Sequence, residues 1–416
     1  MPEQETVSAE TPKKKRKIGY WIFLGIMLLV FGVQYLLAQS PAVCDWYLDN
    51  LSPKLSQGIG GLMSRISLPV CEICMLAAAA FCAVLLVMLI LLIFLRKRKG
   101  YRRFVGFCVK LTLAVALAAL ISEPIYDAVT VNASLLGDPA YVQEKHDFDD
   151  LTALWNFWVR QANQMMHGAE RDEHDHLILR SDDVIRAEIQ KAAERLSDRY
   201  PRLGLPTPQP KTSIASQIVA GMQISAYYIE PWRELVFTVS EQSRTRYMSV
   251  YAHEYSHFCG YHKEDEANFL AVLLCLESDD PNIRYAGWLD VRSYIWNEIE
   301  NEFFGDRPHD YEDPDYLAFT ETTAEFDDYF LLHGDLTGNY KGYHKMRGEE
   351  IPEDTRKDNP EIISNDKAKE LITAAGQKKY ENAREMLGDH YYDGVVQRLL
   401  DYYADDLRAD ASDRKE

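Results

Sequence analysis

Three long apolar runs near the start of the chain constrain its fold more than any other feature. They extend over Ile18–Ala38, Leu68–Leu95 and Phe104–Ile121. Crossing the hydrocarbon core of a bilayer takes about 20 helical residues, and a run of about 18 with few charges is long enough. A cleaved signal peptide would explain only the first run. The sequence therefore predicts three transmembrane helices, at 18–38, 70–95 and 104–121.

Basic side chains predict the orientation of these helices. They cluster at 13–17, before the first run, and at 96–103, between the second and the third. Positively charged segments beside membrane helices stay in the cytoplasm. Residues 1–17 are therefore expected to form a basic cytoplasmic N-terminus of a multi-pass protein of the cell membrane. Residues 39–67 would form an outer loop, and residues 122–149 a juxtamembrane linker leading to an extracytoplasmic domain.

Charge is divided unevenly between this membrane unit and the remaining chain. Residues 1–121 carry 14 Lys and Arg against six Asp and Glu, whereas the rest of the chain carries 31 against 58. The net charge of −19 argues against a nucleic-acid partner, because nucleic-acid binding requires clustered Lys and Arg. The composition instead indicates a lipid bilayer as partner of the first part and water as solvent of the second.

Residues 150–416 have the pattern of a mostly helical α+β domain with a small sheet. Two short β-like runs, Ile224–Ile229 and Glu234–Val239, read as a hairpin. The charged segments 305–320 and 334–365 are expected to be loops. Helical spacing begins at Leu151 and recurs in six later segments: Ser181–Tyr200, Arg244–Cys259, Glu264–Glu277, Pro281–Glu300, Asp366–Leu387 and Tyr391–Tyr403.

An H-E-x-x-H motif lies in one of the expected helices. His253 and His257 are four residues apart, so a helix places both imidazoles on one face, where they can bind one metal ion. Glu254 follows the first histidine, and its carboxylate can act as a general base on water at the metal. Gly260 stands where the helix should end. Two histidines on a solvated helix face would give the same letters without a site.

A catalytic zinc site needs a third protein ligand and one open position. In one class of such sites the third ligand is a histidine six residues after the motif, but this chain has Lys263 there, and a protonated lysine repels a dication. Glu264 is the preferred alternative, and Asn268 follows it on the same helical face. Glu266 points about 200° away from Glu264 around the helix, so it is an alternative ligand and not a second one.

These residues resemble two groups of proteins. The E-x-x-A-N segment after H-E-x-x-H resembles gluzincin-type zinc metallopeptidases, in which the corresponding positions imply His253, His257 and Glu264 as Zn²⁺ ligands and Glu254 as general base. The longer pattern H-E-x-x-H-x-x-G-x-x-x-E-x-E-A-N-F, together with three N-terminal spans, resembles a bacterial membrane-anchored family of unknown function. The resemblance implies a zincin-like fold and no particular substrate. Gluzincins often have Asp where Asn268 stands here.

The resemblance predicts a membrane-anchored zinc metallopeptidase that hydrolyses peptide bonds outside the cytoplasm, acting on a peptide or protein substrate bound along a sheet edge. By analogy alone, Tyr391 and Tyr392 are candidate donors to the transition state. A non-catalytic zincin-like domain that binds peptides or cell-envelope components is the alternative function, and a structural membrane protein with a fortuitous motif is a third. A second histidine-rich stretch, His167–His176, is expected to be a solvated loop.

Overall fold

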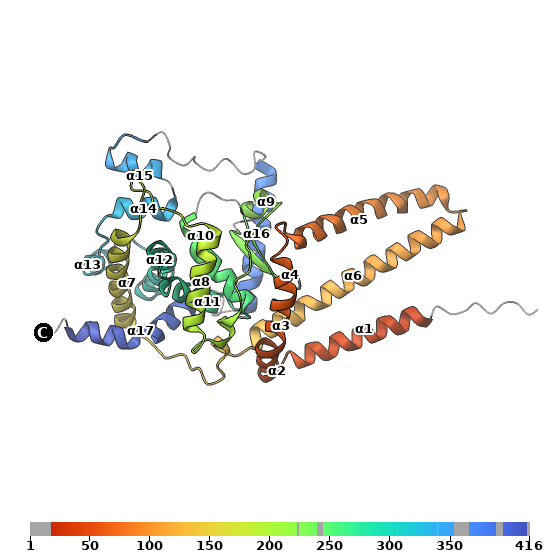
Figure 1. The fold of residues 1–416 in the computed structure, drawn as a ribbon, viewed down its shortest axis with the longest axis horizontal. Helices are drawn as coiled ribbons and strands as arrows, with labels where there is room; N and C mark the ends of the chain where they lie inside the picture. Colours follow the sequence, from red (N-terminus) through yellow and green to blue (C-terminus); the bar gives the residue numbers. More distant parts are fainter. Residues whose placement is uncertain are drawn as a thin grey trace, which may run out of the picture.

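A helical body and three long apolar helices make up the molecule (Figure 1). The computed structural model describes residues 18–222, 224–238, 244–305, 307–338, 340–352, 366–387 and 394–413. The long helices are α1 (Ile18–Leu37), α5 (Val70–Leu95) and α6 (Lys99–Asn132), and they extend together from one end of the body. Each is long and apolar enough to cross a membrane, and few residues of its apolar window are buried. So large an exposed apolar surface fits a bilayer, and the predicted three spans are confirmed in that sense.

The third helix is longer than the predicted span. It passes the end of the apolar run at Ile121 and continues to Asn132, so the expected linker at 122–149 is irregular only in its later part. Ala128 and Thr130, in this extension, are buried. The Asn132 amide donates to the carbonyl of Ala38 at the end of the first span (3.1 Å). Hydropathy did not predict the extension because contacts with other parts of the chain stabilise it.

The segment 39–67 is not a simple outer loop, which corrects the expectation. It contains α2 (Pro41–Trp46), α3 (Ser52–Leu55) and α4 (Gly61–Met63), joined by wide helical turns, and these lie where the three membrane helices meet the body (Figure 1). The Ser56 hydroxyl donates to the carbonyl of Phe258 (3.1 Å), and Arg202 forms ion pairs with Asp45 (3.3 Å) and Asp49 (2.7 Å). The segment is therefore part of the body.

Helices packed around one apolar core form the body. The first body helix begins with a capping box formed by Asp147 and Asp150. Its large apolar side chains, including Trp155 and Trp158, recur with the helical period and therefore all face the core. Gly287 allows a close helix crossing, because a Cβ there would lie 2.5 Å from the Cβ of Cys275. The main body helices are α7 (Phe148–Gly168), α8 (Asp182–Leu196), α10 (Arg244–Phe258), α11 (Glu264–Leu276), α12 (Pro281–Phe304) and α17 (Gly394–Asp413).

Smaller helices occupy regions where loops were expected. Short apolar stretches within the charged segments 305–320 and 334–365, or just before the second of them, form these helices by packing on the core, as Leu332 and Tyr343 do. They are α13 (Pro314–Thr320), α14 (Tyr329–Thr337) and α15 (Tyr340–Arg347). Two others are α9 (Ser216–Gly221), between the first two strands, and α16 (Asp366–Leu387), which matches its predicted range.

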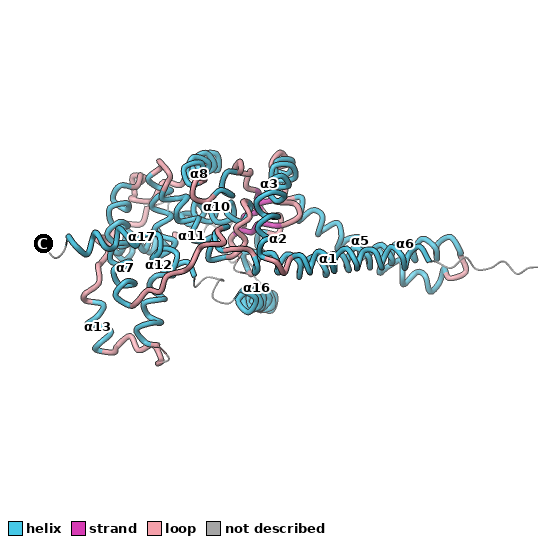
Figure 2. Tube along the Cα trace, turned by 90° about the horizontal axis from the view of Figure 1, so that it is seen from below, coloured by secondary structure: helices cyan, strands magenta, loops and turns pink. Residues whose placement is uncertain are grey.

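A small sheet lies at the end of the body next to the membrane helices (Figure 2). Its strand order is β1-β3-β2, with β1 (Lys211–Thr212), β2 (Ala226–Ile229) and β3 (Glu234–Phe237). The hairpin of β2 and β3 is antiparallel, with Tyr228 opposite Leu235, and β1 runs parallel to β3. The predicted hairpin is confirmed, although Val239 lies outside the described residues. In the described sheet β2 is an edge strand.

Candidate metal centre

The two motif histidines face each other on α10. Their Nε2 atoms are 3.1 Å apart, and the ring planes are nearly perpendicular, at 87°. The four-residue spacing on one helix produces this convergence, as the sequence predicts. Both residues are largely shielded from solvent, with His257 buried. Two imidazole nitrogens directed at one point form two sides of a metal site.

The third side comes from the first residue of the next helix. Gly260 reverses the chain after α10 with φ of +99°, a conformation that favours glycine. The turn brings Glu264 back over the histidines, with its carboxylate oxygens 3.3 Å from Nε2 of His253 and 3.7 Å from Nε2 of His257. These three side chains each offer a ligand atom, and the atoms lie within 4.8 Å of one another. Two His and one Glu are a donor set of catalytic zinc sites.

A hydrogen bond fixes the orientation of the His257 ring. Its Nδ1 lies 2.8 Å from the carbonyl oxygen of Tyr261, so Nδ1 carries the donated proton and Nε2 faces the site. Burial lowers the pKa of His257, but its hydrogen bond to Glu264 and nearby acidic charges outweigh burial and raise the pKa to about 9. Burial raises the pKa of Glu264, yet its hydrogen bonds to both histidines hold that pKa well below the usual value. The site therefore favours a positive charge at its centre.

Glu254 is buried beside the two histidines. Its side chain is buried, and Oε2 has no hydrogen-bond partner among the described residues. Burial raises the pKa of the carboxyl above its usual value, against the opposing effect of the two histidines. The backbone of Tyr228 in β2 hydrogen-bonds to the carboxylate and lowers the pKa. Glu254 thus lies between the two histidines and the edge strand, with one oxygen available to a further group.

The remaining predicted residues of α11 have different places. Glu266 is buried and accepts the backbone N–H of Leu136 (2.6 Å), so it anchors the segment after α6 and lies outside the three-residue group. Asn268, one turn after Glu264, is buried with Nδ2 unbonded among the described residues. Tyr391 and Tyr392 lie outside the described residues, and their role as donors stays a prediction.

The structure brings to this region residues that sequence reasoning missed. His262, in the turn after α10, lies with Nδ1 3.2 Å from the hydroxyl of Tyr126 in α6, and its ring stacks on that of Tyr228 (centroids 6.2 Å apart). Burial holds the pKa of His262 well below its usual value, so the ring is neutral. Nothing in the local sequence around Tyr126 predicts this contact, because the two residues are 136 positions apart.

A second group of possible ligands is explained by hydrogen bonds. Glu144, His146 and Asp401 have ligand atoms within 4.8 Å of one another. Nε2 of His146 lies 2.6 Å from Asp401, and the Tyr141 hydroxyl donates to the other oxygen of that carboxylate (2.5 Å). These bonds fasten the segment before α7 to α17 and account for the arrangement without an ion.

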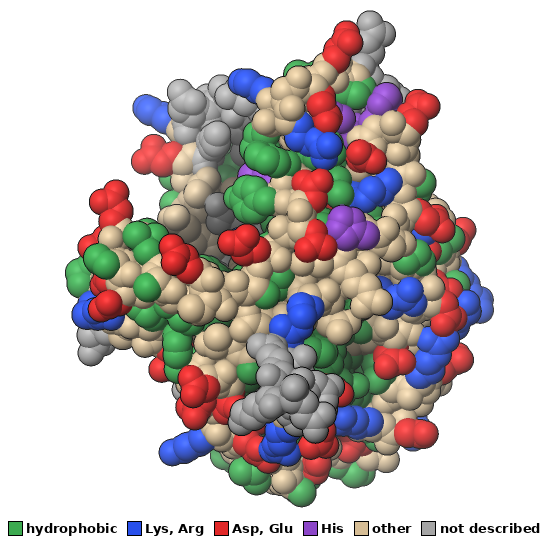
Figure 3. All heavy atoms as spheres, turned by 90° about the vertical axis from the view of Figure 1, so that its left-hand side faces the viewer, with side chains coloured by type: hydrophobic (Ala, Val, Ile, Leu, Met, Phe, Trp, Pro, Cys, Tyr) green, Lys and Arg blue, Asp and Glu red, His purple; other side chains and the backbone are tan. Residues whose placement is uncertain are grey.

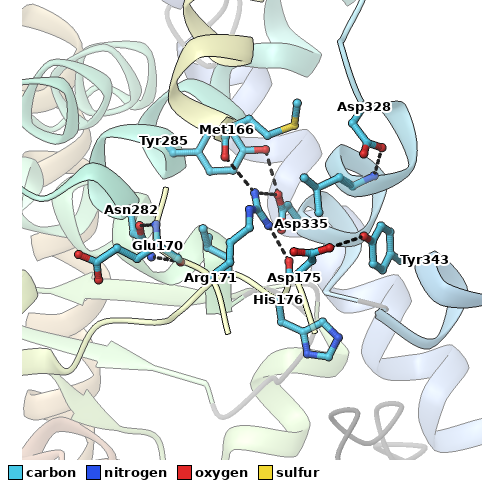
Figure 4. A network of polar contacts seen from close by, with 12 residues as sticks. Met166, Glu170, Arg171, Asp175, His176, Asn282, Tyr285, Asp328, Asp335 and Tyr343 are labelled. Atoms are coloured by element: carbon cyan, nitrogen blue, oxygen red, sulfur yellow. Dashed lines mark hydrogen bonds and ion pairs between the residues drawn. The ribbon is translucent and has the colours of Figure 1, made fainter. Parts of the chain in front are cut away.

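A buried polar network lies in the part of the body that holds α14 (Figure 4). Arg171 forms a bidentate ion pair with Asp335 (2.7 and 3.1 Å), and the hydroxyls of Tyr285 (3.0 Å) and Tyr340 (2.8 Å) donate to the same carboxylate. Nearby, His176 is buried, with Nε2 3.0 Å from Nε2 of His344 in α15. The expected solvated loop is therefore wrong for His176, because packing against α15 shields it.

Comparison with known proteins identifies a family and no activity. The model of a family described as "Protein of unknown function (DUF3810)" matches residues 47–312. This range includes α5, α6, the sheet and the helices that carry His253, Glu254, His257 and Glu264. No curated protein and no solved structure matches the chain. Since the match covers more than half of its length, the chain belongs to the DUF3810 family of proteins of unknown function.

Proposed function

We propose that this protein is a membrane-anchored zinc metallopeptidase of zincin-like type, with its catalytic body outside the cytoplasm. The observation that carries the proposal is the convergence of His253, His257 and Glu264, beside a buried glutamate with an unbonded oxygen. The residues fit zinc because they can provide two imidazole nitrogens and one carboxylate and leave the remaining position to water.

The chain's own residues would divide the work of hydrolysis. His253, His257 and Glu264 would hold the ion, which when bound lowers the pKa of water and polarises a peptide carbonyl. Glu254 would accept a proton from the attacking water and deliver it to the leaving amine. Its raised pKa suits this role, because a general base works best when its pKa lies near the working pH.

The edge strand β2 would position the substrate. The N–H of Thr238 donates to the carbonyl of Ser225, and the N–H of Arg233 donates to the carbonyl of Ile229. Ser225, Tyr227 and Ile229 are therefore the residues whose backbone groups face β3. Alternation in antiparallel pairing then directs the N–H and C=O groups of Ala226 and Tyr228 away from β3. A substrate segment can pair with Ala226 and with the carbonyl of Tyr228 as an added strand, next to Glu254, which accepts the N–H of Tyr228.

The placement outside the cytoplasm is supported by charge. The basic connection between α5 and α6 lies at the end of the membrane helices remote from the body (Figure 1). If the positive-inside rule holds that connection in the cytoplasm, the body is on the opposite side of the membrane.

The substitution Glu254→Gln tests the proposal. The purified full chain in detergent should contain about one zinc per molecule and cleave members of a mixed peptide library, as mass spectrometry would detect. The variant should keep its zinc and lose at least about a hundredfold in rate, the usual contribution of a general base. The matched control is Glu302→Gln, at an exposed helical glutamate, which should keep wild-type rates.

Two results would contradict the proposal. One is a zinc-loaded Glu254→Gln variant that cleaves as fast as the wild type. The other is a wild-type protein without stoichiometric metal. Stoichiometric zinc with peptide binding but no turnover would instead support the non-catalytic receptor.

A further inference from the structure

The turn that carries the third ligand is bonded to the outer end of a membrane helix. His262 contacts the hydroxyl of Tyr126 in α6, and the Lys263 ammonium donates to the carbonyl of Ala133, the residue after that helix (2.6 Å). Lys263 is buried, so this bond is shielded from water. The Glu264 ligand follows directly, which fixes the proposed metal centre relative to α6.

The edge strand is bonded to the outer end of another membrane helix. Glu72, in the first turn of α5, accepts hydrogen bonds from the hydroxyls of Tyr227 in β2 (2.7 Å) and Ser213 (2.5 Å). In return, Glu234 in β3 accepts the first backbone N–H groups of α5, from Val70 (3.2 Å) and Cys71 (2.9 Å). Both sides of the proposed substrate-binding region are thus fastened to helices that enter the membrane.

The sequence of these helices gives the height of the site above the hydrocarbon. Tyr126 follows Ile121, the last residue of the third apolar run, by five positions, which is about 7.5 Å along a helix. Glu72 precedes the uninterrupted apolar run of α5 by only a few residues. The headgroup layer on one side of a bilayer is about 5–7 Å thick. The contacts of His262 and of β2 therefore lie at the membrane surface.

The side chains around this region differ from those on the remote face. Leu62, Leu68, Ile214 and Ile218 are each more than half exposed, and the backbone N–H of Ile214 is itself bonded to Glu72 (2.5 Å). Such exposed apolar groups fit a bilayer interface. The face farthest from the membrane helices carries many acidic and basic side chains among its apolar ones (Figure 3).

We propose that the substrate is the juxtamembrane segment of a polypeptide anchored in the same bilayer by an apolar helix, cut within about ten residues of the membrane surface. This inference rests on the proposed peptidase function. An extended chain advances about 3.3 Å per residue, so a few residues carry a segment from the surface to β2. Confinement to the membrane raises the effective concentration of such a segment near β2. A folded soluble protein lacks this advantage and must approach β2 at the level of the headgroups.

The full chain, loaded with zinc in phosphatidylcholine–phosphatidylglycerol vesicles, provides the test. One substrate set is a single apolar transmembrane helix followed by 30 residues of mixed sequence on the side of the body. The other set is the same mixed segments without the helix, at equal total concentration. Mass spectrometry maps each cut relative to the last apolar residue. Cuts in the anchored set should concentrate within ten residues of the helix, at rates at least tenfold above those of the free set. The Glu254→Gln variant is the blank.

The outcomes separate the two proposals. Cleavage of the free set at equal or higher rates, or cuts spread evenly over the 30 residues, overturns the membrane-surface inference and leaves the peptidase function standing. Cuts found only beyond about 20 residues also overturn it, because the site would then stand well above the membrane. No zinc-dependent cut in either set overturns the peptidase function itself.

Discussion

Replacing Asp335 by Ala should destabilise the body more than any exposed substitution. The carboxylate is fully buried in α14, where it accepts both arms of the Arg171 guanidinium and two tyrosine hydroxyls. Asp335 lies beyond the part of the chain that the family model matches, whereas Arg171 and Tyr285 lie within it. The substitution therefore asks whether the region after residue 312 is integral to the fold.

The size of the effect follows from the contacts. Removing one partner of a buried ion pair costs about 3–5 kcal/mol, because the remaining charge is left buried and uncompensated. The Arg171 side chain is only 12% exposed, so water cannot replace the carboxylate. At about 2–4 °C per kcal/mol for a body of this size, the unfolding midpoint should fall by roughly 10 °C.

Tryptophan fluorescence during heating of the detergent-solubilised full chain measures this midpoint. The matched control is Asp405→Ala, which removes an ion pair whose carboxylate is 98% exposed and should shift the midpoint by less than about 3 °C, since exposed pairs contribute about 0–1 kcal/mol. The double variant Asp335→Ala with Arg171→Met should be more stable than the sum of the single losses predicts. A shift below 2 °C for Asp335→Ala, or strict additivity in the double variant, would refute the reasoning.

Two further predictions concern the metal centre and the helix packing. In the metal-free protein the pKa of His257 is raised to about 9, so protonated His257 stabilises the fold fully below pH 6.5 and progressively less as the pH rises through 9. The pKa of Glu264 is lowered, so ionised Glu264 stabilises the fold above pH 4.5 and less as the pH falls. The thermal midpoint of chelator-treated protein should therefore decline between pH 6.5 and 9.5 more steeply than that of a His257→Gln variant, and equal slopes would contradict the pairing. Gly287→Ala should lower the thermal midpoint, because the added methyl group overpacks the helix crossing at a cost of about 1–3 kcal/mol. The control Gly204→Ala should leave the midpoint unchanged, because no atom lies within 4 Å of the new Cβ. Unchanged stability of Gly287→Ala would show that α11 and α12 can separate freely.

Sequence periodicity predicted the elements whose residue pattern is local to the element itself. The first two apolar runs, the hairpin and the two helices around Gly260 are local patterns, and the structure has them within a few residues of the predicted bounds. The approach of His253, His257 and Glu264 also follows from local geometry, because one helical turn and one short reversal produce it.

The missed features depend on contacts between distant residues. The helices within 39–67 and the extension of α6 are stabilised by partners that lie more than 90 positions away, such as Phe258 for Ser56 and Ala38 for Asn132. Hydropathy assigns each residue to membrane or water and contains no information about such partners. The involvement of Tyr126 with His262 could not be predicted for the same reason.

The ion pairs of Arg202 determine whether the body can be expressed without the N-terminal helices. This guanidinium is 4% exposed, and its two carboxylate partners, Asp45 and Asp49, belong to the stretch that links the first and second spans. A shortened polypeptide that begins after α6 would retain the cation inside the protein and discard both counter-ions. Expression of the body without the N-terminal helices should therefore yield an insoluble product. The residues before α7 and the body form a single folding unit that must be expressed and purified whole.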